Sequence, residues 1–67
     1  MKEMNPIEIG AKLLKLRGEK TRSEVADALK KSQSALAMYE SGQRIPRDNI
    51  KIRIADYYEK PIYEIFF

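Results

Sequence analysis

The sequence contains no cysteine and no histidine among its 67 residues. Without these residues the chain can form neither a disulfide framework nor a usual structural zinc site. No apolar run approaches the roughly 20 residues of a membrane-spanning helix. The first ten residues, MKEMNPIEIG, also lack the apolar core of a secretory signal. We therefore expect a cytoplasmic protein that has no membrane contact and whose stability comes from packing.

The short length argues against an enzyme. A chain of this size forms one domain at most and buries only about 60% of the surface that its unfolded form exposes. It leaves no room for a deep catalytic cavity, and carboxylates such as Asp56 and Glu59 are better explained as the solvated face of a helix. We predict a single domain over residues 1–67 with no catalytic residues, no metal or other cofactor and no small-molecule substrate.

Positive charge is concentrated in the middle of the chain. Residues 12–53 hold eleven lysine or arginine residues and five acidic ones, whereas the two ends together hold two basic and five acidic residues. This central excess suits a surface that meets a polyanion. An ordinary solvated surface has the same composition, so the charge distribution leaves both interpretations open.

A first amphipathic helix is predicted over residues 7–17. Asn5 offers a capping side chain, Pro6 suits the first turn and Gly18 marks the end. Apolar side chains recur at three- and four-residue spacing between these limits: Ile9, Leu13, Leu14 and Leu16.

Two short helices are predicted next. Thr21 and Glu24 have the spacing of a capping box, so a helix begins near Arg22 and runs to about Leu29. Ser32 offers a cap for a third helix over residues 33–41, which ends at Gly42.

The C-terminal third predicts a fourth helix and a final helical turn. Pro46 prevents helix continuity, and Asp48 or Asn49 offers the next cap. Pro61 ends that helix. Its inward residues are expected to be Ile50, Ile54 and Tyr57 or Tyr58, and the core is expected to be covered by Ile62, Ile65 and Phe66. No stretch has strand periodicity, so the predicted fold is all-α, a compact bundle of about five short helices.

Residues 22–41 have the geometry of a helix-turn-helix, because only three residues separate the two short helices. Small Ala26 suits the close approach of the pair, which is expected to pack through Val25, Leu29, Leu36 and Tyr39. At about 100° per residue, one face of the third helix carries only small or polar groups and a single methionine. Such groups can approach base edges without charge repulsion. This face is made of Gln33, Ser34, Ala37, Met38 and Ser41.

The stretch TRSEVADALKKSQSALAMYESGQRIP resembles the helix-turn-helix of the Cro/cI-type phage repressor family, also called the xenobiotic-response-element family. In that family a Ser or Thr and a Gln open the second helix, a Leu-Ala pair follows, and the recognition helix begins after Ser or Thr. An aromatic-Glu-x-Gly turn, basic residues and a proline then close the motif. Here these elements are Thr21 with Arg22, Val25 with Ala26, Ser32 with Gln33, then Tyr39, Glu40, Ser41 and Gly42, with Gln43, Arg44 and Pro46.

The resemblance spans nearly the whole chain, because IGAKLLKLR is similar to the family's first helix and IADYYEKPIYEIF to its closing segments. It implies a lambda-repressor-like DNA-binding domain, encoded by a prokaryote or a phage and acting at the nucleoid. It also implies the roles of individual residues. The base-reading set is Gln33, Ser34, Ala37 and Met38, and the phosphate-binding set is Arg22, Ser32, Ser41, Gln43 and Arg44.

Three further expectations follow from the resemblance. Lys30 stands where the family has glycine, at a position of positive φ. Either Lys30 takes this conformation, at a cost of about 1–2 kcal/mol, or the turn differs locally from that of the family. Arg22 stands where the family has glutamine and keeps the phosphate role. Glu40 is expected to pair with a basic residue of the first helix, for which we predict Lys15.

The sequence leaves two functions open. The first is a dimeric, Cro-like transcriptional repressor that reads a palindromic operator in double-stranded DNA. We expect no sensor domain after Phe67, so its control is expected to come from its concentration, from competition or from a partner protein. The second is a protein-interaction module, or a partner of antitoxin or antirepressor type, that uses the aromatic C-terminus. For the first, dimer contacts are predicted at Tyr58, Tyr63, Phe66 and Phe67.

Overall fold

The computed structural model describes residues 4–67. Within this range it contains five helices and no strand, which confirms the predicted all-α fold. The helices are α1 (Pro6–Arg17), α2 (Arg22–Leu29), α3 (Gln33–Ser41), α4 (Asp48–Tyr58) and α5 (Ile62–Phe66).

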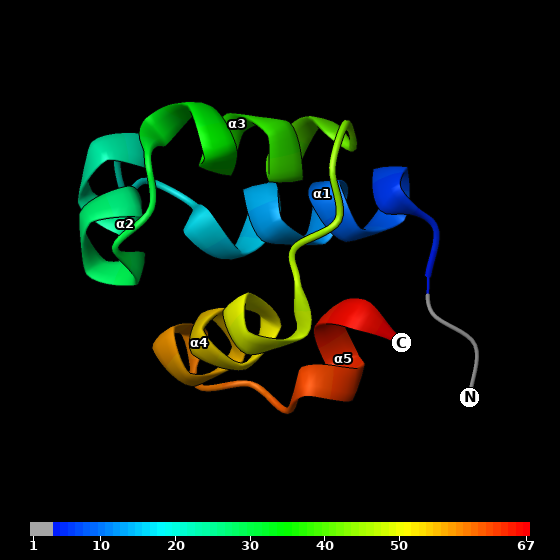
Figure 1. Cartoon of the computed structure of the whole chain (residues 1–67). Coiled ribbons are helices and arrows are strands. Elements are labelled where there is room, and N and C mark those ends of the chain that lie inside the picture. The colour runs from blue at the N-terminus through cyan, green and yellow to red at the C-terminus, as the bar shows by residue number, and fades with distance from the viewer. Residues whose placement is uncertain (1–3) are drawn as a thin grey trace.

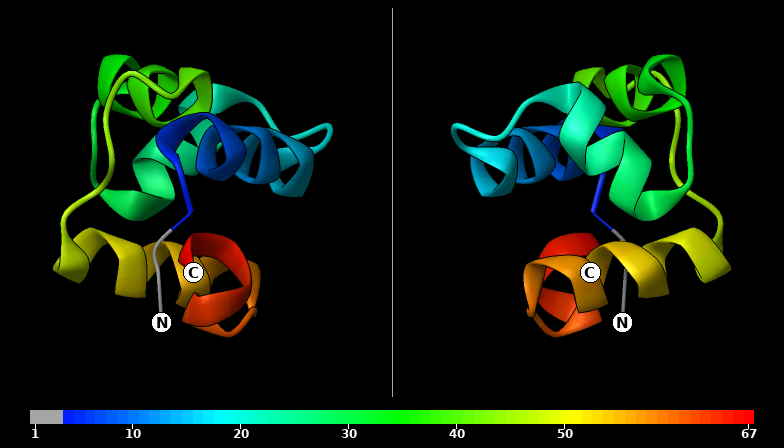
Figure 2. Two further views of the ribbon diagram at one scale, coloured as in Figure 1. Left: turned by 90° about the vertical axis from the view of Figure 1, so that its right-hand side faces the viewer. Right: turned by 90° about the vertical axis from the view of Figure 1, so that its left-hand side faces the viewer.

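The helices are arranged in two tiers (Figure 1). α3 lies along α1, and α2 closes one end of this pair, while α4 and α5 pack against the other side of the assembly. The side views in Figure 2 show the same division, with the segment of residues 42–47 descending from the end of α3 to the start of α4. No other helix covers the side of α3 that faces away from α1.

Local capping bonds set the starts of the first three helices. Asn5 Oδ1 accepts a hydrogen bond from the Glu8 N–H at 2.9 Å, and Thr21 Oγ1 accepts one from the Glu24 N–H at 3.0 Å. Ser32 Oγ likewise accepts a bond from the Ala35 N–H at 3.0 Å. All three predicted capping residues are therefore confirmed.

The predicted cap of the fourth helix is wrong. Arg47 holds the N-cap position of α4 and makes no side-chain capping bond. The Arg47 carbonyl accepts from both the Ile50 and the Lys51 N–H at 2.9 Å, so Asp48 and Asn49 already lie inside the first turn. The position at which α4 begins is set by packing and not by a capping side chain, because Pro46 and Ile50 are buried on either side of Arg47.

All five helices contribute to one hydrophobic core. The side chains predicted to join α2 and α3 are buried: Val25, Leu29, Leu36 and Tyr39. In α1 only Ile9 and Leu13 of the predicted apolar stripe are buried, whereas Leu14 is 48% exposed. Ile65 and Phe66 of α5 are buried in the core, as expected.

The assignment of Phe66 to a dimer contact is wrong, because this side chain is 0% exposed and has no surface that a partner could contact.

Lys30 ends α2 in the left-handed conformation, with φ 57° and ψ 42°, so of the two alternatives that the sequence left open the turn keeps the positive φ. Replacing Lys30 by glycine should raise the free energy of unfolding by about 0.5–1 kcal/mol, because glycine takes this conformation without strain but has more freedom when unfolded. Urea denaturation measures the change. Lys31→Gly is the control, since positive φ outside glycine occurs in residues 4–67 only at Lys30 and Glu59. A loss of stability in Lys30→Gly would contradict the prediction.

Candidate nucleic-acid interface

The outward face of α3 brings the four predicted base-reading residues together. Gln33 and Ser34 are exposed in the first turn, and Ala37 and Met38 are half-buried one turn later. The opposite face holds the buried Leu36, which packs into the core. The face turned to solvent therefore presents an amide, a hydroxyl, a methyl group and a thioether, all of which can meet base edges or a thymine methyl.

The five predicted phosphate-binding residues lie around this face. Arg22 and Ser32 stand at the starts of α2 and α3, where backbone N–H groups and the helix dipole favour an anion. Ser41, Gln43 and Arg44 lie at the other end of α3, and all five residues are exposed.

The carbonyl of Met38 restricts how the second group can contact an anion. It accepts hydrogen bonds from the Gln43 N–H at 2.9 Å and the Arg44 N–H at 3.3 Å. The Ser41 hydroxyl also donates to this carbonyl, at 3.3 Å. Because these donors are already paired within the protein, an anion at this end meets the side chains of Gln43 and Arg44.

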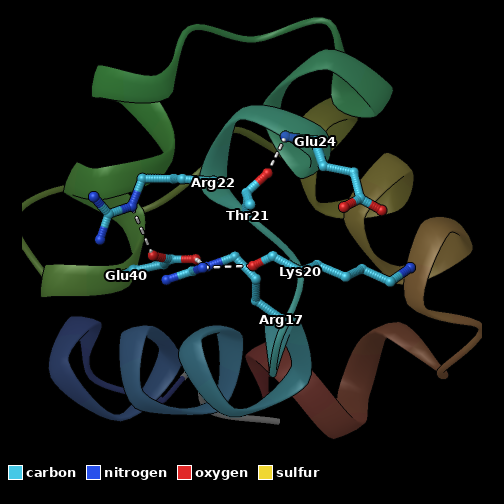
Figure 3. A network of polar contacts seen from close by, with 6 residues as sticks. All are labelled: Arg17, Lys20, Thr21, Arg22, Glu24 and Glu40. Carbon is cyan, nitrogen blue, oxygen red and sulfur yellow. Dashed lines mark hydrogen bonds and ion pairs between the residues drawn. The ribbon is translucent and has the colours of Figure 1, made fainter.

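A buried carboxylate joins three helices behind the interface (Figure 3). The Glu40 side chain is 3% exposed, its Oε2 lies 2.7 Å from Arg17 Nε, and its Oε1 lies 3.2 Å from Arg22 Nε. Arg17 also donates from Nη1 to the Lys20 carbonyl at 2.7 Å. This Glu40 network ties α3 to the end of α1 and the start of α2.

The predicted partner of Glu40, Lys15, is wrong. The first-helix partner is Arg17, two residues further on. Two residues correspond to about 200° around a helix, so Lys15 and Arg17 point to nearly opposite sides of α1. Lys15 is exposed, whereas the Arg17 side chain is only 15% exposed.

The Glu40 network also positions Arg22. Glu40 engages the Nε of Arg22, and the side chain remains 45% exposed. Figure 3 shows the contact to Glu40 at Nε, with one terminal nitrogen of the guanidinium directed away from the carboxylate. Arg22 is therefore held at one end while its remaining donors face solvent, a geometry suited to a phosphate oxygen.

The phenol of Tyr58 lies near this network. Burial, with a smaller contribution from the Glu40 charge, raises the pKa of Tyr58 to about 12. Its ring contacts that of Tyr57 edge to face at 5.0 Å. Tyr58 is half-buried, whereas Tyr63 is 56% and Phe67 37% exposed. Those two residues carry most of the exposed surface of the predicted dimer set.

A polar hollow of about 370 Å³ adjoins the C-terminal end of α3. Its lining includes the side chains of Lys31, Tyr39, Arg44 and Arg47. Arg44 belongs to the predicted phosphate-binding set, whereas Lys31 and Arg47 do not. Both belong to the positive excess of residues 12–53, but no local motif marks them. The fold brings them together because the segment that joins α3 to α4 lies beside the turn between α2 and α3, where Lys31 stands.

Comparison with known proteins agrees with this geometry. Residues 11–65 match a family model described as Helix-turn-helix, of the Cro/cI type. Searches among curated proteins and among solved structures found no match. The family match covers most of the chain, so the protein belongs to the Cro/cI-type helix-turn-helix family, as its sequence predicted. This is a family of DNA-binding regulatory domains and not of enzymes.

None of the helices in residues 4–67 combines the length and the hydropathy needed to cross a membrane.

Proposed function

We propose that the protein is a sequence-specific transcriptional repressor that inserts α3 into the major groove of DNA. The observation that carries this proposal is the outward face of α3, which is uncovered by other helices and bears Gln33 and Ser34 in its first turn. The Gln33 amide suits a bidentate contact with adenine, and Ser34 can donate to or accept from either base type. Ala37 and Met38 extend the face with apolar groups that suit a thymine methyl.

Phosphate contacts position this helix on the duplex. Ser32 stands at the start of α3, Arg22 lies beside Glu40 near the end of α3, and Ser41, Gln43 and Arg44 lie at that C-terminal end. We add Lys31 and Arg47 to this set, because both line the polar hollow with Arg44. The interface then has cationic side chains on both flanks of a nearly neutral reading face.

The repressor acts as a homodimer on a palindromic operator. A two-fold pair of these domains places its recognition helices in successive major grooves, about 34–36 Å apart. Tyr63 and Phe67 are four residues apart at the exposed C-terminal segment and form the core of the dimer contact. Occupation of the operator excludes polymerase from an overlapping promoter.

Selection from a randomised duplex pool, followed by sequencing at two salt concentrations, tests the base and phosphate assignments. In Gln33→Ala, one base position in each half-site should lose its preference, with about 1–3 kcal/mol less discrimination. In Arg44→Ala, binding to all sequences should weaken and the salt dependence should become shallower by about one phosphate contact.

Gln33→Ala and Arg44→Ala serve as controls for each other, because each variant truncates an exposed side chain to alanine. If no sequence is enriched with the unmodified protein, the proposal is wrong. The exposed aromatic pair Tyr63 and Phe67 then favours the second function, a protein-interaction module.

A further inference from the structure

A groove of about 390 Å³ lies between α1 and the C-terminal segment that contains α5. α3 and α5 lie against different sides of α1 (Figure 1). The groove is therefore remote from the outward face of α3, and its residues are not used in the proposed DNA contact. They are Lys12, Lys15, Leu16, Lys60, Glu64 and Ile65.

The floor and the rim of the groove have different chemistry. The floor is apolar, formed by the half-buried Leu16 and by Ile65, which is 1% exposed. The rim carries Lys12, Lys15 and Lys60, all exposed, and a single carboxylate, Glu64. The Lys12 ammonium donates to the Glu64 backbone carbonyl, which joins the two walls. The rim thus has a clear positive excess around an apolar floor.

We propose that this groove binds an acidic segment of another protein, with one or two large apolar side chains on the floor and carboxylates opposite the rim lysines. Charge complementarity identifies the occupant, because three ammonium groups and one carboxylate favour an anionic partner. The α1 wall, from Lys12 to Leu16, is about one helical turn or 6 Å long. This length suits one or two anchor side chains and not a long amphipathic helix.

A peptide fits this chemistry better than a small-molecule effector. Sites for small molecules usually hold a few rigid polar groups that fix the orientation of the ligand. The charged side chains here are exposed, on long flexible stems, and the two apolar floor residues offer no hydrogen bond. Such a rim gives a salt-sensitive attraction for carboxylates spaced along an extended chain.

Fluorescence anisotropy tests the proposal with a short fluorescein-labelled peptide of repeating Asp-Glu-Leu-Phe pattern as the probe. We expect saturable binding with Kd on the order of 10–100 µM that weakens with salt. Two control peptides separate the apolar contribution to binding from the electrostatic one. The first has serine at the apolar positions, and the second has lysine at the acidic positions. Neither should bind. The experiment contains no DNA, so its result is independent of the proposed repressor function.

Charge-reversal variants locate the peptide on the protein. Lys15→Glu and Lys60→Glu should each raise Kd by about fivefold or more. Lys20→Glu makes the same charge change on the link between α1 and α2, outside the groove, and should leave Kd within about twofold of the unmodified protein. Lys12 is left unchanged because its bond to Glu64 also joins the groove walls.

Amide chemical-shift mapping supplies the second readout and confirms that each variant is folded. Shifts caused by the peptide should cluster at the groove residues of α1 and α5. The proposal is overturned by an absence of saturable binding, by equal effects of Lys15→Glu and Lys20→Glu, or by shifts centred on α3. It is also overturned if Lys15→Glu changes the oligomeric state in sedimentation, because the groove would then bind a second copy of the chain.

Discussion

Replacing Gly10 by alanine is expected to lower the free energy of unfolding by about 3 kcal/mol or more. A Cβ atom at this position would lie 2.8 Å from the Tyr39 carbonyl oxygen and closer still to that of Glu40. These atoms belong to the backbone of α3, so they cannot move aside as a flexible side chain does. The alanine methyl can be accommodated only if α1 and α3 separate.

The sign of the effect distinguishes this explanation from helix propensity. Propensity alone predicts that alanine stabilises a helix by about 1 kcal/mol relative to glycine. Urea denaturation of Gly10→Ala measures the steric cost together with the propensity gain. Ala11→Gly at the exposed neighbouring position measures helix propensity alone. The control should lose about 1 kcal/mol. A gain of stability in Gly10→Ala would show that the close approach of α1 and α3 is wrong.

Replacing Glu40 by alanine is expected to lower the free energy of unfolding by about 3 kcal/mol. The change leaves the Nε donors of Arg17 and Arg22 without their acceptor, and the Arg17 side chain is only 15% exposed. Removing one member of a buried ion pair costs about 3–5 kcal/mol, and the partial exposure of Arg22 places this network at the lower end.

A double-mutant cycle in urea denaturation measures how Glu40 and Arg22 are coupled. Arg22→Ala alone should cost less than about 1 kcal/mol, because that side chain is 45% exposed. Glu40→Gln keeps the shape and one acceptor oxygen, so it should retain part of the stability. If Glu40→Ala costs no more than Arg22→Ala, the carboxylate is not the centre of the network.

Loss of the Glu40 carboxylate is also expected to affect DNA binding. Arg22 is the only predicted phosphate-binding residue held by Glu40 in the described part of the chain. Freeing Arg22 should therefore weaken DNA affinity in Glu40→Ala without changing the preferred sequence, since phosphate contacts carry no direct base information.

Local signals explain why so much of the fold could be predicted from the sequence. Asn5, Thr21 and Ser32 cap their helices through bonds that span only three residues. Glycine or a residue in the left-handed conformation ends each of the first three helices. The composition of α3 likewise indicated which of its faces is apolar, because Leu36 and Tyr39 recur at helical spacing.

Apart from the cap of α4, which is Arg47 and not Asp48 or Asn49, the errors concern contacts between distant segments. Lys15 and Arg17 are equivalent basic residues in the sequence, and only the rotation of α1 against α3 decides that Arg17 meets Glu40. Phe66 and Phe67 are adjacent aromatics, yet one is 0% and the other 37% exposed, because the short α5 turns a single face to the core. Neither choice is encoded in local spacing.

The sequence by itself determined the helix boundaries up to the start of α4 and the small, polar face of α3. These features depend on backbone hydrogen bonds and side-chain periodicity within a few residues. The tertiary structure alone decided that Gly10 must lack a side chain, that Glu40 fixes Arg22, and that Lys31 and Arg47 join Arg44. These features depend on which helices approach one another, and the packing of the whole core sets those distances.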